Sequence, residues 1–163
     1  MENANIAELV ERVVTGDPWH GLNVEQLLRG VSAADAASRP VSDAHTIWEL
    51  VLHMTSWARE VRSRLEGHDA REPIDGDWPP VGIVNEERWA EAQRQLLEAH
   101  SRLTEAIVAL DARSLDEPVR DNRDNALGAG LSRYLTLHGL VHHTVYHAGQ
   151  LALLKKALGR REA

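Results

Sequence analysis

The fold class is decided by residues 131–158, which read LSRYLTLHGLVHHTVYHAGQLALLKKAL. Apolar residues recur through this stretch at helical spacing, which predicts one long helix with Gly159 as its natural stop. Other helical segments are predicted at about residues 6–13, 24–31, 46–66 and 84–110, with a further helical turn at 32–37. Convincing strand alternation is missing. The sequence therefore predicts an all-α fold, a four-helix bundle with extra short helical turns and long connections near residues 16–45 and 111–130.

A clear start signal precedes the second long helix. Thr46 and Glu49 have the spacing of a capping box, in which the hydroxyl and the carboxylate each satisfy a free backbone N–H. Gly67 is the natural stop of that helix. The three prolines between Gly67 and Gly82 predict a loop, although this loop contains Trp78, a side chain that favours burial.

Composition limits the classes of function. The 163 residues fit one domain, 1–163, and the chain contains no cysteine, which excludes disulfides, thiolate metal ligands and a cysteine nucleophile. A net charge of -7 with scattered basic residues argues against a nucleic-acid partner. The N-terminus lacks the basic start of a signal peptide, and no run approaches the roughly 18 apolar residues of a membrane span. We therefore expect a soluble, cytoplasmic protein with no membrane partner.

Two of the nine histidines lie on one face of the last predicted helix. His143 and His147 project about 40° apart, on the face that also holds Leu140, Leu151 and Leu154. Burying both rings without partners would be costly, and a shared metal ion would satisfy one nitrogen of each, at the spacing of H-x-x-x-H zinc helices. The simpler alternative, a pair of hydrogen-bonded core histidines, stays open at this point.

A third ligand has to come from another segment. His53 is the best candidate because it lies at the edge of the apolar stripe of its helix, about 40° from Trp57 and 60° from Leu50. His45 precedes the cap and is expected to be exposed. His138 and His142 point away from the face of the pair, although His142 could still flank the site. We expect His20, His68 and His100 to be solvated.

Two segments resemble the signature motifs of the DinB-like (DinB/YfiT-like metalloenzyme) superfamily. Residues 45–53, HTIWELVLH, followed by Trp57, resemble its second-helix signature, and residues 143–154, HTVYHAGQLALL, resemble its final-helix motif. The loop Asp77-Trp78-Pro79 and the segment Trp19-His20-Gly21 also look like this family. The resemblance covers nearly the whole chain, and its most specific part is the H-x-x-x-H-x-G-Q element.

The resemblance implies a four-helix bundle with one divalent metal ion, zinc or nickel before manganese, held by three histidines. By motif position the ligands are His53, His143 and His147, in agreement with the helical-face argument. The resemblance also implies a homodimer, although the sequence shows no long exposed apolar stripe that independently demands one. Characterised relatives include S-transferases that use bacillithiol or mycothiol and a mycothiol-dependent maleylpyruvate isomerase. A low-molecular-weight thiol is therefore an expected co-substrate.

Three histidine ligands leave at least one coordination position open, which is typical of catalytic metal sites. Three further residues are candidates for catalytic or supporting roles: Glu49, Gln150 and Tyr146. Two of them have an alternative role, since Glu49 fits the capping box better and Tyr146 fits an interface equally well. The tryptophans are expected in the core rather than as a substrate platform: Trp48, Trp57, Trp78 and Trp89.

The residues and the resemblance together predict a metal-dependent enzyme that acts on a small molecule. We expect a transferase that moves an electrophile onto a low-molecular-weight thiol. A metal-dependent hydrolase is the close alternative, because the same site could activate water. Two further alternatives are a non-catalytic, metal-binding stress-response module and a helical bundle that holds no metal.

Overall fold

The computed structural model describes residues 2–122 and 130–159. Its α-helices are α1 (Glu2–Val14), α2 (Val24–Leu28), α3 (Ala33–Ala37), α4 (Ile47–Leu65), α5 (Glu86–Ala109) and α6 (Arg133–Ala157), with one 3-10 helix, η1 (Ala112–Asp116). These two ranges contain no strand, so the prediction of an all-α fold is confirmed.

Some predicted boundaries differ from the observed ones. The first helix already begins at Glu2, and the helix predicted over 24–31 ends at Leu28. That second helix ends early because Gly30 takes a φ of +72°, which a continuing helix cannot use. The predicted connection over 111–130 contains η1, while its residues 123–129 lie outside the described part of the chain.

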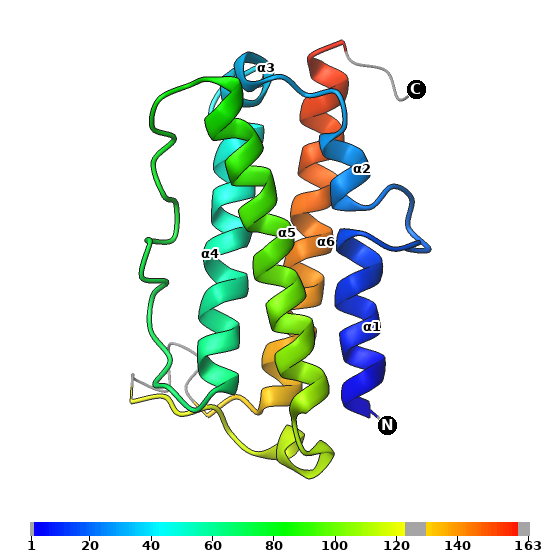
Figure 1. Cartoon of the computed structure of the whole chain (residues 1–163), viewed down its shortest axis with the longest axis vertical. Coiled ribbons are helices and arrows are strands. Elements are labelled where there is room, and N and C mark those ends of the chain that lie inside the picture. Colours follow the sequence, from blue (N-terminus) through cyan, green and yellow to red (C-terminus); the bar gives the residue numbers. More distant parts are fainter. Residues whose placement is uncertain (1, 123–129, 160–163) are drawn as a thin grey trace.

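Each of the four long helices packs against two others. Helix α5 lies against α1 and α4, and α6 also lies against α1 and α4. In Figure 1 the chain runs upward through α1 and α6 and downward through α4 and α5. Because α4 and α5 run in the same direction, residues 66–85 have to return along the length of α4 before α5 begins. This return segment brings a loop beside the middle of α4.

Helix α4 begins at the predicted capping box. The backbone N–H of Glu49 donates to the Thr46 hydroxyl over 3.1 Å, and the backbone N–H of Thr46 donates to the Glu49 carboxylate over 2.7 Å. Arg39 pairs with the same carboxylate at 3.0 Å. At the other end Gly67 has a φ of +90°, which side chains rarely adopt, so the helix stops there. Glu49 is therefore engaged at the start of the helix.

The core consists of two apolar clusters, and they meet in the middle of α4 and α6. On α4, Met54 belongs to the cluster built with α2 and α3, and Ala58 belongs to the cluster built with α1. On α6, Val141 belongs to the α1 cluster and Ala148 to the other. His53 lies at this junction on α4, and His143 and His147 lie between the two clusters on α6.

Candidate metal centre

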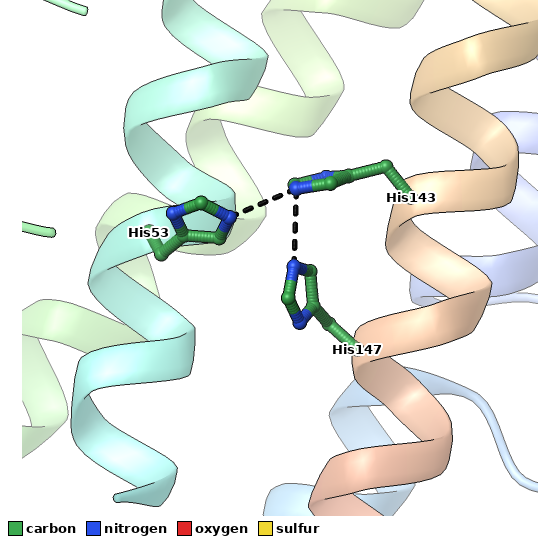
Figure 2. A group of neighbouring side chains, drawn as sticks. All are labelled: His53, His143 and His147. Atoms are coloured by element: carbon green, nitrogen blue, oxygen red, sulfur yellow. Dashed lines mark hydrogen bonds between the residues drawn. The ribbon is translucent and has the colours of Figure 1, made fainter. Parts of the chain in front are cut away.

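Three imidazole rings from α4 and α6 converge at this junction (Figure 2). The Nε2 atom of His143 lies 2.8 Å from Nε2 of His53 and 3.0 Å from Nε2 of His147. One nitrogen from each ring therefore falls within a single group whose atoms are all within 4.8 Å of one another. Two nitrogens that share an ion in tetrahedral geometry, at bonds of about 2.0–2.1 Å, lie roughly 3.3 Å apart, so the separations of 2.8 and 3.0 Å are close to those of a metal site.

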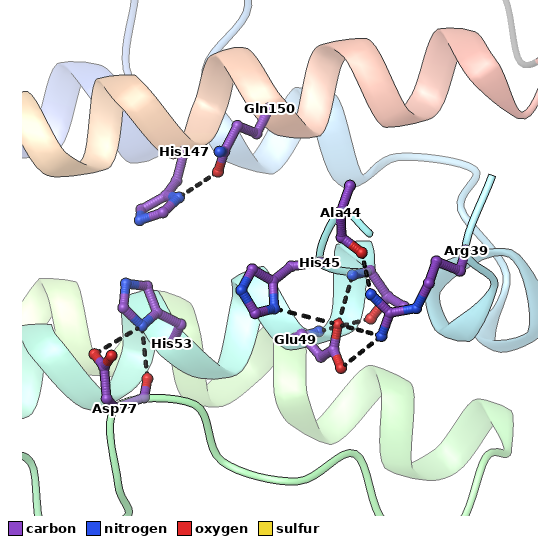
Figure 3. Close-up of polar contacts among 9 residues, drawn as sticks. Arg39, Ala44, His45, Glu49, His53, Asp77, His147 and Gln150 are labelled. Carbon is purple, nitrogen blue, oxygen red and sulfur yellow. Dashed lines mark hydrogen bonds and ion pairs between the residues drawn. The ribbon is translucent and has the colours of Figure 1, made fainter. Parts of the chain in front are cut away.

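The outer nitrogens of two rings are held by acceptors (Figure 3). Nδ1 of His53 donates to the backbone carbonyl of Asp77 over 2.6 Å, and Nδ1 of His147 donates to Oε1 of Gln150 over 2.6 Å. Because the proton of each neutral ring sits on Nδ1, each Nε2 presents a bare lone pair to the cluster. Hydrogen bonds of this kind orient histidines that ligate metals.

In the metal-free cluster, no placement of the ring protons gives every nitrogen a hydrogen-bond partner among the described residues. A neutral His143 carries one N–H, and its Nδ1 is buried without a partner among the described residues. If the proton is on Nε2, Nδ1 is left bare; if it is on Nδ1, three lone pairs face one another. Either state leaves buried polar atoms unsatisfied, which is costly. A divalent cation bound by the three Nε2 atoms takes up all three lone pairs and leaves only the Nδ1–H of His143 without a partner among the described residues, so the donor set fits such an ion.

Burial keeps the three rings neutral. It lowers the pKa of His53 and His147 below the ordinary value of 6.5, and burial with the neighbouring His147 and His53 lowers the pKa of His143 to about 4. The metal-free rings are therefore unprotonated near pH 7, the state in which imidazole binds metals.

Two tryptophans flank the cluster instead of filling the core. The ring of Trp78, from the return segment, stacks on His53 with centroids 3.9 Å apart and on His45 at 3.4 Å. The indole N–H of Trp57 donates to the Asp77 carboxylate over 2.7 Å. The expectation of a core position holds for Trp48 and Trp89, which are buried, but not for these two half-buried rings. The reason is the course of the return segment, residues 66–85, which brings Trp78 against His53 and Asp77 against Trp57. Sequence periodicity does not predict the course of such a segment.

An apolar groove of about 350 Å³ runs beside the cluster between α4 and α6. His53 and His143 line it, together with Trp57, Val61 and Leu140. A molecule bound there would lie against His53 and His143, two of the three residues of the cluster. A second cavity of about 400 Å³ lies between α4 and α5, but it is lined by ion pairs such as Arg59–Asp75 and contains none of the three histidines.

The three weaker candidates from the sequence differ in how close they lie to the three-histidine cluster. Gln150 contacts His147 as described above, whereas Glu49 contacts Thr46 and Arg39, and lies 3.6 Å from Nδ1 of His45 (Figure 3). The side chain of Tyr146 is 64% exposed and touches His147 only edge-on, with centroids 5.1 Å apart. Glu49 thus supports the helix start, and Tyr146 lies mostly on the outer surface.

Most of the remaining histidines lie where the sequence predicted, and one does not. His20, His45, His68 and His142 are exposed, whereas His100 is only 3% exposed. The expectation of a solvated His100 was wrong because its Nδ1 donates to the Leu96 carbonyl of its own helix over 2.9 Å, which allows the ring to be buried. Leu96 and Leu103, on the same side of α5, mark this face as a core face in the sequence.

The comparisons with known proteins point to one family. The family model described as the DinB superfamily matches residues 20–151, a range that includes all three histidines of the cluster. Searches among curated proteins and among solved structures gave no match. Among the helices of the described ranges, none has the length and apolar character needed to cross a membrane. The matched range covers most of the chain, and the chain therefore belongs to the DinB superfamily.

Proposed function

We propose that the protein is a metal-dependent enzyme whose ion is bound by His53, His143 and His147. The observation that carries this proposal is the convergence of three Nε2 atoms, 2.8 and 3.0 Å apart, from rings that burial keeps neutral. Zinc and nickel suit three imidazole ligands best, with manganese as the weaker candidate. Three protein ligands leave a coordination position for a substrate, as in catalytic sites.

When bound, the ion would lower the pKa of a coordinated thiol or water and so supply a nucleophile near neutral pH. The surrounding residues prepare this chemistry. The Asp77 carbonyl and Gln150 hold the Nδ1 protons of His53 and His147, and Trp78 covers one face of His53 against water. The groove offers an apolar surface on which a small molecule can lie beside the cluster.

The reaction that we propose is transfer of a small apolar electrophile onto a low-molecular-weight thiol of the bacillithiol or mycothiol type. Two facts support it. The chain has no cysteine, so any thiol must come from outside. The groove walls are mostly apolar, which suits the electrophile better than a polar thiol or a charged substrate. Such thiols are kept reduced in the cytoplasm, where we propose that the protein acts, on small molecules and without a nucleic-acid partner.

Two other functions use the same cluster. A hydrolase would activate water in place of the thiol, and a non-catalytic module would keep the metal for stability or for a response to stress. Both are separable from the transferase by experiment.

The test begins with metal analysis of protein purified without an affinity-tag metal column. The proposal expects about one divalent ion per chain. The loaded protein is then given aryl esters and epoxides, which react with either a thiol or water, with and without a low-molecular-weight thiol. Thioester or thioether formation that depends strictly on the thiol supports the transferase, and turnover without the thiol supports the hydrolase. Bound metal without turnover in either assay would assign the module, and absence of metal would reject all three.

A further inference from the structure

A third cavity, of about 230 Å³, lies between α1 and α5, which run side by side in Figure 1. It is lined by residues within 10–15, at the C-terminal end of α1, and within 97–105 of α5. None of them belongs to the three-histidine cluster or lines the groove beside it. The cavity is larger than one water molecule needs and smaller than the roughly 300 Å³ at which pockets for drug-sized ligands begin. It is therefore a separate candidate site for a small molecule.

His100 gives this cavity a buried hydrogen-bond acceptor that has no partner among the described residues. The residue lines the cavity but is only 3% exposed, and its Nδ1 donates to the Leu96 carbonyl of its own helix over 2.9 Å. Burial lowers the pKa of His100 below 6.5, so the ring is neutral near pH 7 and its second nitrogen, Nε2, carries a lone pair. A buried lone pair without a donor is costly. A ligand in the cavity that donates a hydrogen bond to Nε2 would remove this cost.

The polar groups around His100 also favour a ligand with a positive charge. The carboxylates of Glu11 and Glu105 line the cavity and form no ion pair or hydrogen bond with another described residue, and no described residue of the lining is Lys or Arg. The hydroxyls of Thr15 and Thr104 donate to carbonyls of their own helices, over 3.5 and 2.9 Å, so their oxygens are left as acceptors. The C-terminal end of α1 adds a partial negative charge. The polar part of the lining therefore consists mainly of acceptors and negative charge.

An organic cation fits this lining better than a metal ion. Of the described residues, only the three-histidine cluster brings three donor atoms of His, Asp or Glu close enough together to share an ion. The other walls of the cavity are apolar, since Val10 and Val14 are 4% and 3% exposed and Leu97 is half-buried. Such walls suit a short hydrocarbon chain, which a metal ion does not have.

We infer that the cavity between α1 and α5 binds a small primary alkylammonium ion. One N–H group donates to Nε2 of His100, the carboxylates of Glu11 and Glu105 attract the positive charge, and the carbon chain packs on Val10 and Val14. The inference is independent of the proposed enzyme activity, because it uses no residue of the three-histidine cluster.

Titration of the full chain with butylammonium chloride tests the class of ligand. We expect saturable binding in calorimetry, about tenfold or more tighter than that of n-butanol, which lacks the charge, or of tetramethylammonium, which lacks an N–H group. Equal binding of n-butanol would reject the positive charge as the determinant, and equal binding of tetramethylammonium would reject the hydrogen bond to Nε2. Absence of saturable butylammonium binding would overturn the proposal.

Two double variants with the same change in net charge test where the ion binds. Glu11→Gln with Glu105→Gln removes both carboxylates at the cavity, and we expect the dissociation constant of butylammonium to rise by about tenfold or more. Glu2→Gln with Glu87→Gln removes one exposed carboxylate from each of the same two helices, outside the cavity lining, and should leave the dissociation constant unchanged. Equal losses in the two variants would mean that the net charge of the chain attracts the ion, and would overturn the site.

A third measurement reports on His100 directly. In NMR of the protein with nitrogen-labelled histidine, the Nε2 signal of His100 should shift as butylammonium saturates the site, because a bare lone pair becomes a hydrogen-bond acceptor. His100→Phe keeps a ring but removes the acceptor, and should weaken binding by about tenfold or more while the helical circular dichroism is retained. If this variant does not fold, the NMR signal decides alone, and an Nε2 signal that stays unchanged at saturation would overturn the role of His100.

Discussion

Helix α6 carries two pairs of histidines with the same spacing of four residues. His143 and His147 point toward α4, where their rings meet His53. His138 and His142 lie on the outward side, with ring centroids 6.4 Å apart, and the ring of His138 packs on Tyr134 instead. The spacing is identical, yet only the inner pair belongs to a group of the described residues that could hold an ion. A metal site therefore needs burial, a third ligand and acceptors for the outer nitrogens, and spacing alone does not supply them.

The largest expected effect is the loss of bound metal, which should follow a substitution in the inner pair of histidines but not in the outward pair. His143→Ala removes the ring that lies between the other two, so we expect stoichiometric metal to be lost. His142→Ala, the next residue on the same helix, should retain about one ion per chain. Metal content measured after exhaustive dialysis checks both. Equal metal content in the two variants would contradict the assignment of the inner pair.

The next effect concerns the acceptor that only the inner pair has. Gln150→Leu removes the oxygen that accepts from Nδ1 of His147, and we expect metal affinity to fall by about 10- to 100-fold. Gln93→Leu, a half-buried position on α5, is the control and should leave the affinity unchanged. Competition with a chromophoric chelator measures the dissociation constants. An unchanged affinity in Gln150→Leu would mean that this hydrogen bond does not position the ligand.

The two pairs of histidines can also be compared through the effect of pH on the free energy of unfolding of the metal-free protein. The folded state lowers the pKa of His143 from 6.5 to about 4, so in this window the unfolded chain binds a proton that the folded chain does not. The free energy of unfolding should therefore decrease as the pH falls from about 6.5 to 4, by at most about 1.4 kcal/mol per pH unit for each such proton. Urea unfolding at several pH values checks this. His143→Ala should show a shallower slope than His142→Ala, and equal slopes would contradict the stated cause.

The smallest effect is expected at Asp77. Asp77→Ala removes the carboxylate that accepts from Trp57 and lies 3.3 Å from Nδ1 of His53, but it keeps the backbone carbonyl that accepts from His53 over the shorter distance of 2.6 Å. We expect metal affinity to change by only a few-fold, less than in Gln150→Leu. The same chelator competition measures it. A loss as large as that of Gln150→Leu would show that the side chain, and not the backbone, orients His53.

The sequence predicted the helices and the three histidines because both depend on periodicity. The side of a helix that faces the core follows from its apolar residues, and that side carries His53, His143 and His147. The partners of their outer nitrogens were harder to predict. Gln150 lies one turn from His147 on the same helix and could be proposed, whereas the Asp77 carbonyl belongs to a loop whose path the sequence does not specify.

One further feature was missed for an equally physical reason. The burial of His100 depends on a hydrogen bond to its own helix, which makes a polar ring compatible with a core position. The core position of His100 could have been recognised in the sequence, since it follows from the angular positions of Leu96, His100 and Leu103 around α5.

The bond between His53 and the Asp77 carbonyl has a consequence for how the sequence can vary. A main-chain oxygen is present whichever amino acid occupies its position, so the shorter of the two contacts that Asp77 makes with Nδ1 of His53 survives substitution at residue 77. What must be conserved instead is the path of the chain: an insertion or deletion in residues 66–85 would displace the oxygen even if every side chain around the cluster were kept. Among relatives, the length of this segment should therefore follow the presence of the three histidines more closely than the identity of residue 77 does.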